Sequence, residues 1–266
     1  KDTSSSNLTL SGANTYSGGS SVQYGTLKAG NATAYGSGTV TVGLNANSLG
    51  TIDLNGQSIA NNLVLNGGHT TGAITNSSST AATASGAVTI SSASSIDGAN
   101  TLNFTGVVSA GNNGIAFVGA GTYSLSNTSN TLATIATSST AVAGLSIANS
   151  GWLTVGSVTV NSVVYSGWAI TGNLSVNAPL RMGGTITTGG TQTYGNAVEL
   201  VANTTLVTYT NGSGTTQANK AITFSSTVNG AYSLNLVNGT ATTTFNAEVG
   251  GTAALASLTT ATGTTS

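Results

Sequence analysis

Charged residues are very scarce in this sequence. Asp, Glu, Lys and Arg make up only 3% of its 266 residues, against about a quarter in a typical soluble domain. This scarcity excludes a basic face for nucleic acid or anionic lipid, and it excludes an acidic run for calcium, because each needs several like charges together. The formal net charge is −1, and the charged residues are scattered: Lys1, Asp2, Lys28, Asp53, Asp97, Arg181, Glu199, Lys220 and Glu248.

Cysteine is absent, and proline and histidine occur once each, as Pro179 and His69. Without cysteine the chain has no disulfide framework, no thiolate metal site and no cysteine nucleophile. A single proline leaves nearly every backbone N–H available for a β-ladder. No apolar run approaches the ~20 residues of a membrane-spanning helix, so we expect no membrane insertion. The chain begins at Lys1 without a visible signal peptide, and we interpret it as a processed or excised segment.

Short alternating strands separated by turns fill the sequence. Straight-chain helix formers are rare, whereas Thr, Val, Ile and Ser are abundant and Gly or Asn recurs at short intervals. That composition favours strands and turns. Apolar and polar residues alternate in triplets such as 40–42 (VTV), 63–65 (LVL) and 102–104 (LNF). Alternation directs the apolar side chains to one face of a strand and the polar side chains to the other.

A stack of short coils explains this pattern better than a sandwich or a barrel, because strand length and composition hardly change along the chain. Residues 37–42 (SGTVTV), 85–90 (SGAVTI) and 155–160 (VGSVTV) also resemble one another. We therefore predict an all-β chain folded as one continuous β-solenoid over residues 1–266, with irregular coils. At roughly 20 residues per coil it has about thirteen coils, and at ~4.8 Å per coil it is roughly 60 Å long. We expect a bend or coil irregularity around Pro179 and Arg181.

Two stretches carry a family resemblance. Residues 8–30 (LTLSGANTYSGGSSVQYGTLKAG) closely resemble the passenger-associated repeat of bacterial autotransporters, which pairs a leucine strand, a TYSGG turn and a GTL strand. The resemblance extends through residues 8–56. Residues 189–260, which include ITFSSTVNGAYSLNLVNG, resemble more loosely the repeats of filamentous-haemagglutinin-like adhesins. Both families imply a right-handed parallel β-helix that is secreted to the bacterial cell surface.

The resemblances divide the predicted solenoid into three regions. Residues 1–75 are interpreted as autotransporter-repeat-like coils, and residues 189–266 as haemagglutinin-repeat-like coils. Residues 76–188 are assigned as irregular middle coils from composition alone.

Candidate catalytic groups are few. His69 lies in a Gly-rich turn, and we interpret it as a solvent-facing residue rather than the base of a triad with Asp2, Asp53 or Asp97. Asp53 and Asp97 occupy similar strand ends and could stack two coils apart, although a turn-capping role fits them better. No grouping of His, Asp and Glu has the spacing of a metal centre. We therefore predict no catalytic, metal-binding or cofactor-binding residues and no enzymatic activity.

Aromatic residues raise the alternative of a glycan-binding surface. Trp152, Trp168, Tyr165, Tyr194 and Phe117 could form a platform for sugars, but a solenoid more often stacks such rings inside or at coil corners. A binding module predicts an exposed row of aromatic rings in a groove. An ice-binding solenoid, a further alternative, requires a flat Thr array at fixed spacing, and the coil length looks too irregular for one.

Low charge also bears on the two ends of the solenoid. Neither the region from Lys1 to Leu10 nor that from Leu258 to Ser266 contains a strong polar cap. A net charge near zero favours association, and an uncapped end coil presents unpaired sheet edges. We therefore expect self-association through these regions, or continuation of a longer solenoid.

Together these features predict a non-catalytic, secreted or cell-surface structural solenoid. It is either a stalk or passenger segment of a bacterial adhesin or a self-assembling subunit of an extracellular fibre or sheath. The first alternative is an adhesin module that binds glycans or a host surface, and the second is the ice-binding solenoid.

Overall fold

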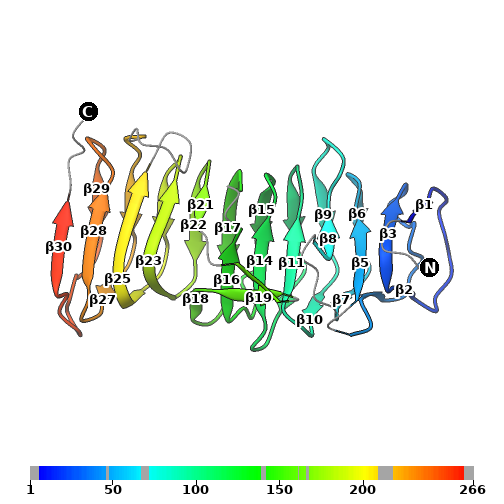
Figure 1. The fold of residues 1–266 in the computed structure, drawn as a ribbon, viewed down its shortest axis with the longest axis horizontal. Helices are drawn as coiled ribbons and strands as arrows, with labels where there is room; N and C mark the ends of the chain where they lie inside the picture. The colour runs from blue at the N-terminus through cyan, green and yellow to red at the C-terminus, as the bar shows by residue number, and fades with distance from the viewer. Residues whose placement is uncertain are drawn as a thin grey trace.

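The computed structural model describes residues 6–45, 48–66, 72–138, 142–160, 162–165, 168–208 and 218–260. These residues form thirty β-strands and no helix. Parallel strands stack into a β-solenoid of about 11 turns, and Figure 1 shows the coils following one another along an elongated rod from the N-terminal to the C-terminal end. The predicted all-β solenoid with irregular coils is confirmed.

Three parallel sheets form the walls of the solenoid. The long sheet runs unbroken from the first coil to the last, and β21 and β27 pair beside its main path. Its strands are β1 (Asn7–Leu10), β3 (Tyr24–Ala29), β5 (Leu49–Asp53), β8 (Ile74–Thr75), β11 (Ser94–Asp97), β14 (Gly114–Val118), β16 (Thr134–Thr137), β18 (Leu153–Val155), β21 (Ala169–Ile170), β23 (Leu180–Thr188), β25 (Val198–Thr208), β27 (Val228–Asn229), β28 (Ser233–Val237) and β30 (Ser257–Thr260).

The other two walls are a nine-stranded and a five-stranded sheet. The nine-stranded sheet contains β6 (Ser58–Ile59), β9 (Ala82–Ala84), β12 (Leu102–Phe104), β15 (Thr122–Leu125), β17 (Gly144–Ala148), β22 (Leu174–Asn177), β24 (Gln192–Tyr194), β26 (Ile222–Phe224) and β29 (Thr243–Phe245). The five-stranded sheet contains β2 (Ser20–Val22), β4 (Val40–Val42), β7 (Leu63–Leu65), β10 (Val88–Ile90) and β13 (Val108–Ser109).

Parallel pairing stacks equivalent residues directly on one another. In the long sheet, the inward-facing column of the first coils consists of Leu8, Leu27, Ile52, Ile74, Ile96 and Phe117. The alternation read from the sequence therefore places apolar side chains in continuous interior columns. From Leu27 onward, each of these side chains removes apolar surface from water by contact with the coils on both sides.

Coil length varies more than the sequence predicts. Leu180 pairs with Val198, 18 residues further on, whereas Val198 pairs with Val228, 30 residues further on. The expected thirteen coils is therefore an overestimate, and about 11 turns are found. At ~4.8 Å per turn they span roughly 50 Å. Loops absorb the extra residues, because a surface loop lengthens at little cost in free energy while the ladder register stays fixed.

One insertion in the middle region is a hairpin that lies outside the solenoid wall. Strands β19 (Val158–Val160) and β20 (Val163–Tyr165) pair antiparallel and form a separate two-stranded sheet. Val158 and Val160 pack on Ala116 and Ala136 of the long sheet in a second, smaller apolar cluster. The hairpin therefore buries the outer face of the wall at this point, and alanine is small enough to let it approach.

The irregularity expected near Pro179 and Arg181 is confirmed. The register between β23 and β25 shifts between Met182, which pairs with Leu200, and Gly184, which pairs with Thr204. Gly184 has a φ of 80°, a left-handed conformation that costs glycine little. The bulge lets the long sheet bend without losing its ladder on either side.

Three aromatic rings form a stack in the last coils. The ring of Phe224 lies 5.0 Å from that of Tyr194 and 4.9 Å from that of Phe245, centroid to centroid, and both pairs are stacked. Tyr194 and Phe224 are buried. The Tyr194 hydroxyl is satisfied by Gln192 Oε1 at 2.9 Å, and Gln192 Nε2 in turn donates to the Val207 carbonyl.

We predict that Phe224→Ala destabilises the fold by about 3–5 kcal/mol, because it leaves a cavity between two rings that cannot close on each other. Urea unfolding followed by circular dichroism measures the loss. Thr223→Ala is the matched control, since Thr223 lies on the same strand and faces outward, and it should change stability by less than about 0.5 kcal/mol. Equal unfolding midpoints for the two variants would contradict the aromatic stack.

Candidate functional site

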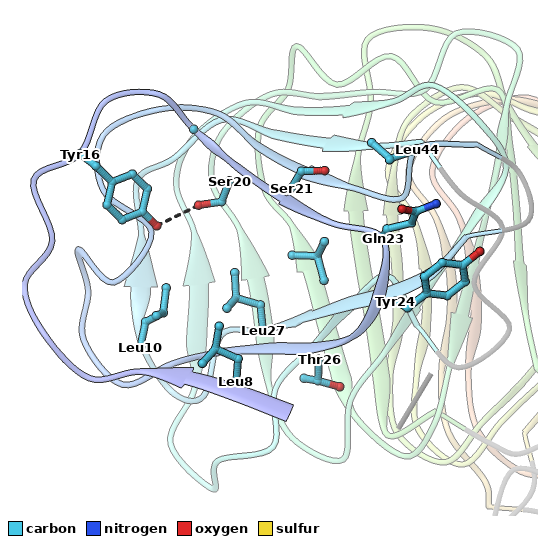
Figure 2. A pocket seen from close by; sticks show the side chains of 12 residues that line it. Leu8, Leu10, Tyr16, Ser20, Ser21, Gln23, Tyr24, Thr26, Leu27 and Leu44 are labelled. Atoms are coloured by element: carbon cyan, nitrogen blue, oxygen red, sulfur yellow. Dashed lines mark hydrogen bonds between the residues drawn. The ribbon is translucent and has the colours of Figure 1, made fainter. Parts of the chain in front are cut away.

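At the N-terminal end of the described residues, the interior column of the solenoid is exposed. Leu8, Leu27 and Ile52 occupy equivalent positions in three successive coils. Their exposed fractions fall from 52% to 8% to 0%. Figure 2 shows Leu8, Leu10 and Leu27 projecting into the mouth of the first coil. The apolar side chains of the first coil thus occupy inward-facing positions of the ladder. They are nevertheless exposed, because no described coil covers them.

This mouth forms an open cavity of about 450 Å³. Leu44 lies at its rim with about half of its surface exposed. Tyr16 lies at another part of the rim, where its hydroxyl hydrogen-bonds Ser20 Oγ at 2.8 Å. The lining is mainly apolar or uncharged polar: Leu8, Leu10, Tyr16, Gly19, Ser20, Ser21, Val22, Gln23, Tyr24, Thr26, Leu27 and Leu44. Among the described residues that line it none is charged, so an apolar surface of matching shape could cover this lining without burying a charge.

The C-terminal end exposes the same kind of interior position. Leu258 of β30 pairs with the buried Leu234 of β28, yet 45% of Leu258 is exposed. Phe245, Val249 and Leu255 contact the core and remain only partly buried. Within the described residues, β1 pairs only with β3 and β30 only with β28. Each end strand of the long sheet therefore has one edge without a ladder partner.

Asp53 caps a turn, as its position in the sequence predicts. It is 3% exposed, and Oδ2 accepts a hydrogen bond from Ser77 Oγ at 2.5 Å. Oδ1 accepts from the backbone N–H groups of Asn55 and Ser77 at 2.9 and 3.0 Å. The Lys28 ammonium lies 3.5 Å from Oδ2. These contacts join three neighbouring coils and occupy the carboxylate with structural partners.

The stacking of Asp53 and Asp97 two coils apart, which the sequence raised as a possibility, is found as well. Asp53 pairs with Thr75, and the residues just before Thr75 and Asp97, Ile74 and Ile96, pair with each other. Two strand spacings separate the two aspartates by roughly 10 Å of backbone. Since Asp53 is held by Ser77 and two N–H groups, the pair does not present two free carboxylates to one substrate.

Asp97 differs from Asp53 in its surroundings. Burial raises the pKa of its carboxyl above the ordinary value of 3.8, and a hydrogen bond from the Gly98 backbone opposes part of that increase. Tyr123 lies nearby, and its hydroxyl donates to the carbonyls of Gly98 and Val118. Asp97 is thus a partly buried acid in a tight corner, enclosed by backbone.

The remaining candidates for chemistry form no centre among the residues that the structure describes. His69 and Asp2 lie outside the described residues. Within the described ranges, no three His, Cys, Asp or Glu side chains are grouped as metal ligands would be, and no helix there is long and apolar enough to cross a membrane.

Most of the candidate aromatic platform is interior. Phe117, Tyr194 and Trp168 are buried, and nothing is described of the Tyr165 side chain. Trp152 alone among the five is exposed, to 42%. The exposed row of aromatic rings that a long sugar-binding face would need is therefore not found in the described part of the chain.

A regular polar column follows the outer face of the nine-stranded sheet. The central residues of its strands are small and uncharged, and they pair in unbroken register: Thr83, Asn103, Ser124, Ser146, Ser175, Thr193, Thr223 and Thr244. Uneven coil length does not disturb this column, because the loops absorb the difference. Its side chains are a mixture of Thr, Ser and Asn rather than the uniform Thr array that ice binding requires.

Comparison with known proteins gives no relative. No family model matches the chain, and no curated protein and no solved structure matches it. The resemblances to autotransporter and haemagglutinin repeats stay predictions from the quoted residues.

The sequence indicated the end regions but not the residues that shape the open mouth. Tyr16 and Leu44 lie in irregular segments between strands, where no periodicity marks an inward side chain. Leu8 follows the strand pattern, and only its place in the first coil makes it a surface residue.

We predict that Asp97 makes the stability of the fold depend on pH. Because its pKa is raised in the folded state, the folded chain binds the proton more tightly than the unfolded chain does. Protonation of Asp97 therefore makes the free energy of unfolding rise as the pH falls from neutral toward 3.8. At pH 7 the charged Asp97 carboxylate destabilises the fold. Asp97→Asn should be more stable than the native chain at pH 7, and this advantage should shrink near pH 4.

Chemical denaturation at the two pH values measures the difference between the two proteins. A difference that stays constant with pH would show that Asp97 is not the group responsible.

Proposed function

We propose that this chain is a non-catalytic structural β-solenoid that acts outside the cell. It serves as a stalk or passenger segment of a surface adhesin, or as a subunit of an extracellular fibre or sheath. In either role its ends are covered by another solenoid coil.

The observation that carries this proposal is the exposure of core columns at both ends. Leu8 and Leu258 occupy positions whose equivalents one coil inward, Leu27 and Leu234, are buried. Covering a leucine fully stabilises a structure by about 1.5–3 kcal/mol. A further coil that stacks on either end would also provide ladder partners for the free edges of β1 and β30. Open ends of this kind are usual where a solenoid continues or associates.

Polarity makes head-to-tail stacking the natural mode of self-association. All strands on the main path of the long sheet run parallel, so β30 of one copy meets β1 of the next in the same direction. Leu258 faces inward as Leu8 does, and Thr260 is equivalent to Leu10. Such a contact joins the C-terminal end of one copy to the N-terminal end of the next. Repeated contacts of this kind give an open filament unless the rotation between copies closes them into a ring.

The extracellular location is supported by the autotransporter-like stretch and by the composition. Uncharged Ser, Thr and Asn side chains cover the walls in place of Lys and Glu. Antibody labelling of intact, unpermeabilised source cells tests the location, with labelling after permeabilisation as the reference. Signal only after permeabilisation would contradict an extracellular role.

We predict that the chain associates in a concentration-dependent manner and that Leu8→Asp abolishes association. Leu8 is half exposed in the single copy, so the substitution is tolerated there. In a stack it would bury an unpaired carboxylate, which costs several kcal/mol. Sedimentation velocity over a range of concentrations measures the association, and negative-stain microscopy shows whether rods lengthen.

The matched control is Val201→Asp. Val201 is exposed to a similar degree and lies on the side of the rod in β25. This variant should associate as the native chain does. A native chain that stays monomeric at high concentration would overturn self-assembly, and equal effects of the two substitutions would show that association does not use the open end.

A further inference from the structure

A groove lies on the side of the rod in its C-terminal part and reaches the last coil, which supplies Glu248. Its volume is about 390 Å³, within the range of small-molecule sites. The groove combines one aromatic ring, two carboxylates, an amide and a stretch of exposed backbone. Its lining is Trp152, Ala197, Val198, Glu199, Thr227, Asn229, Gly230, Glu248, Gly251, Thr252 and Ala253.

The ladder of the long sheet sets the length of this groove. In the long sheet Leu153 pairs with Leu180, Leu180 with Val198 and Val198 with Val228, and Val228 bridges to Val249. The residues one position earlier in each strand therefore form a column of their own. Trp152 and Glu248 thus occupy the same column four strand spacings apart, which is roughly 19 Å. Between them lie Pro179, Ala197 and Thr227, whose side chains are smaller. Small side chains between two large ones produce a trough that runs along the rod axis.

Both walls of the trough are held in place. The Arg181 guanidinium carbon lies 4.8 Å from the centre of the Trp152 ring, and Arg181 Nε donates to Glu199 Oε2 at 2.8 Å. On the far side, Asn229 Oδ1 accepts hydrogen bonds from the backbone N–H groups of Thr252 and Ala253. The ring is therefore fixed by a cation–π contact while 42% of Trp152 remains exposed. A binding surface arranged in advance loses less entropy when a ligand binds.

The chemistry of the lining selects the ligand. An exposed indole offers a flat apolar face for the C–H groups of a pyranose ring, and carboxylate, amide and hydroxyl groups beside it accept and donate hydrogen bonds to sugar hydroxyls. Glu199 and Glu248 outnumber the single cation Arg181, which disfavours an anionic ligand. The trough is open along its length, so it suits a chain rather than a single small molecule.

We infer that this trough binds a linear oligosaccharide of neutral or amino sugars. The ligand lies along the rod axis, with one sugar ring on Trp152 and its far end near Glu248. The trough opens on the side of the rod, so a single copy presents it without a stacked neighbour. A single aromatic ring gives modest affinity for each trough, and repeated copies along a fibre raise the overall avidity.

Isothermal titration calorimetry with three tetrasaccharides tests the inference: tetra-N-acetylchitotetraose as the neutral probe, its fully deacetylated form as the cationic probe, and tetragalacturonate as the anionic probe. We expect the neutral or the cationic probe to bind and the anionic probe to bind at least about tenfold more weakly. Trp152→Ala should weaken binding about tenfold, because the stacked ring is lost. Glu248→Gln should reduce the preference for the cationic over the neutral probe.

Tyr232→Ala is the matched control, since Tyr232 is an exposed aromatic residue that does not line the trough. It should leave binding unchanged. Thermal unfolding of each variant confirms that the fold is retained, which the exposure of Trp152 favours. The inference is overturned if neither neutral nor cationic tetrasaccharide binds, if Trp152→Ala binds as tightly as the native chain, or if tetragalacturonate is preferred.

Discussion

The parallel backbone ladder places each residue directly over its equivalent one coil earlier, and the rest of the molecule depends on this constraint. A coil of this solenoid has no core of its own. Ile52 is buried because Leu27 and Ile74 lie above and below it. Stability is thus a property of neighbouring coils, as in other repeat architectures. The chain tolerates coils of very different length because only the short strands need to keep register.

The same constraint explains why amides and hydroxyls replace charges. A coil corner contains backbone groups that the ladder does not satisfy, and buried ones need partners. Asn61 Nδ2 donates to the carbonyls of Gly36 and Gly38, and Asn76 Nδ2 to those of Thr80 and Thr101. A neutral amide does this without the desolvation cost of an ion. Asp53 is the charged exception, and it has a lysine, a serine and two N–H groups around it.

Places where the column pattern is interrupted are the places that can make contact with other molecules. At the two ends the column stops, so Leu8 and Leu258 keep the apolar surface that an adjoining coil would cover. On the side wall, Trp152 and Glu248 stand at either end of a run of smaller residues and turn a flat sheet into a trough. The interior columns are fully engaged in packing, and for that reason we propose contacts with other molecules at the ends and on the walls.

Sequence alone determined the strands, the turns and the solenoid, because alternation and small turn residues are local signals and they repeat along the whole chain. It also raised the possibility that Asp53 and Asp97 share one column, since both follow an isoleucine in similar strand ends. Tertiary structure decided which coils are long, that β19 and β20 leave the wall as a hairpin, and that Trp152 and Glu248 share one trough although 95 residues separate them. These features depend on how many residues each loop absorbs before the next strand rejoins the ladder. No local pattern encodes that number, because loops of many lengths close at similar cost.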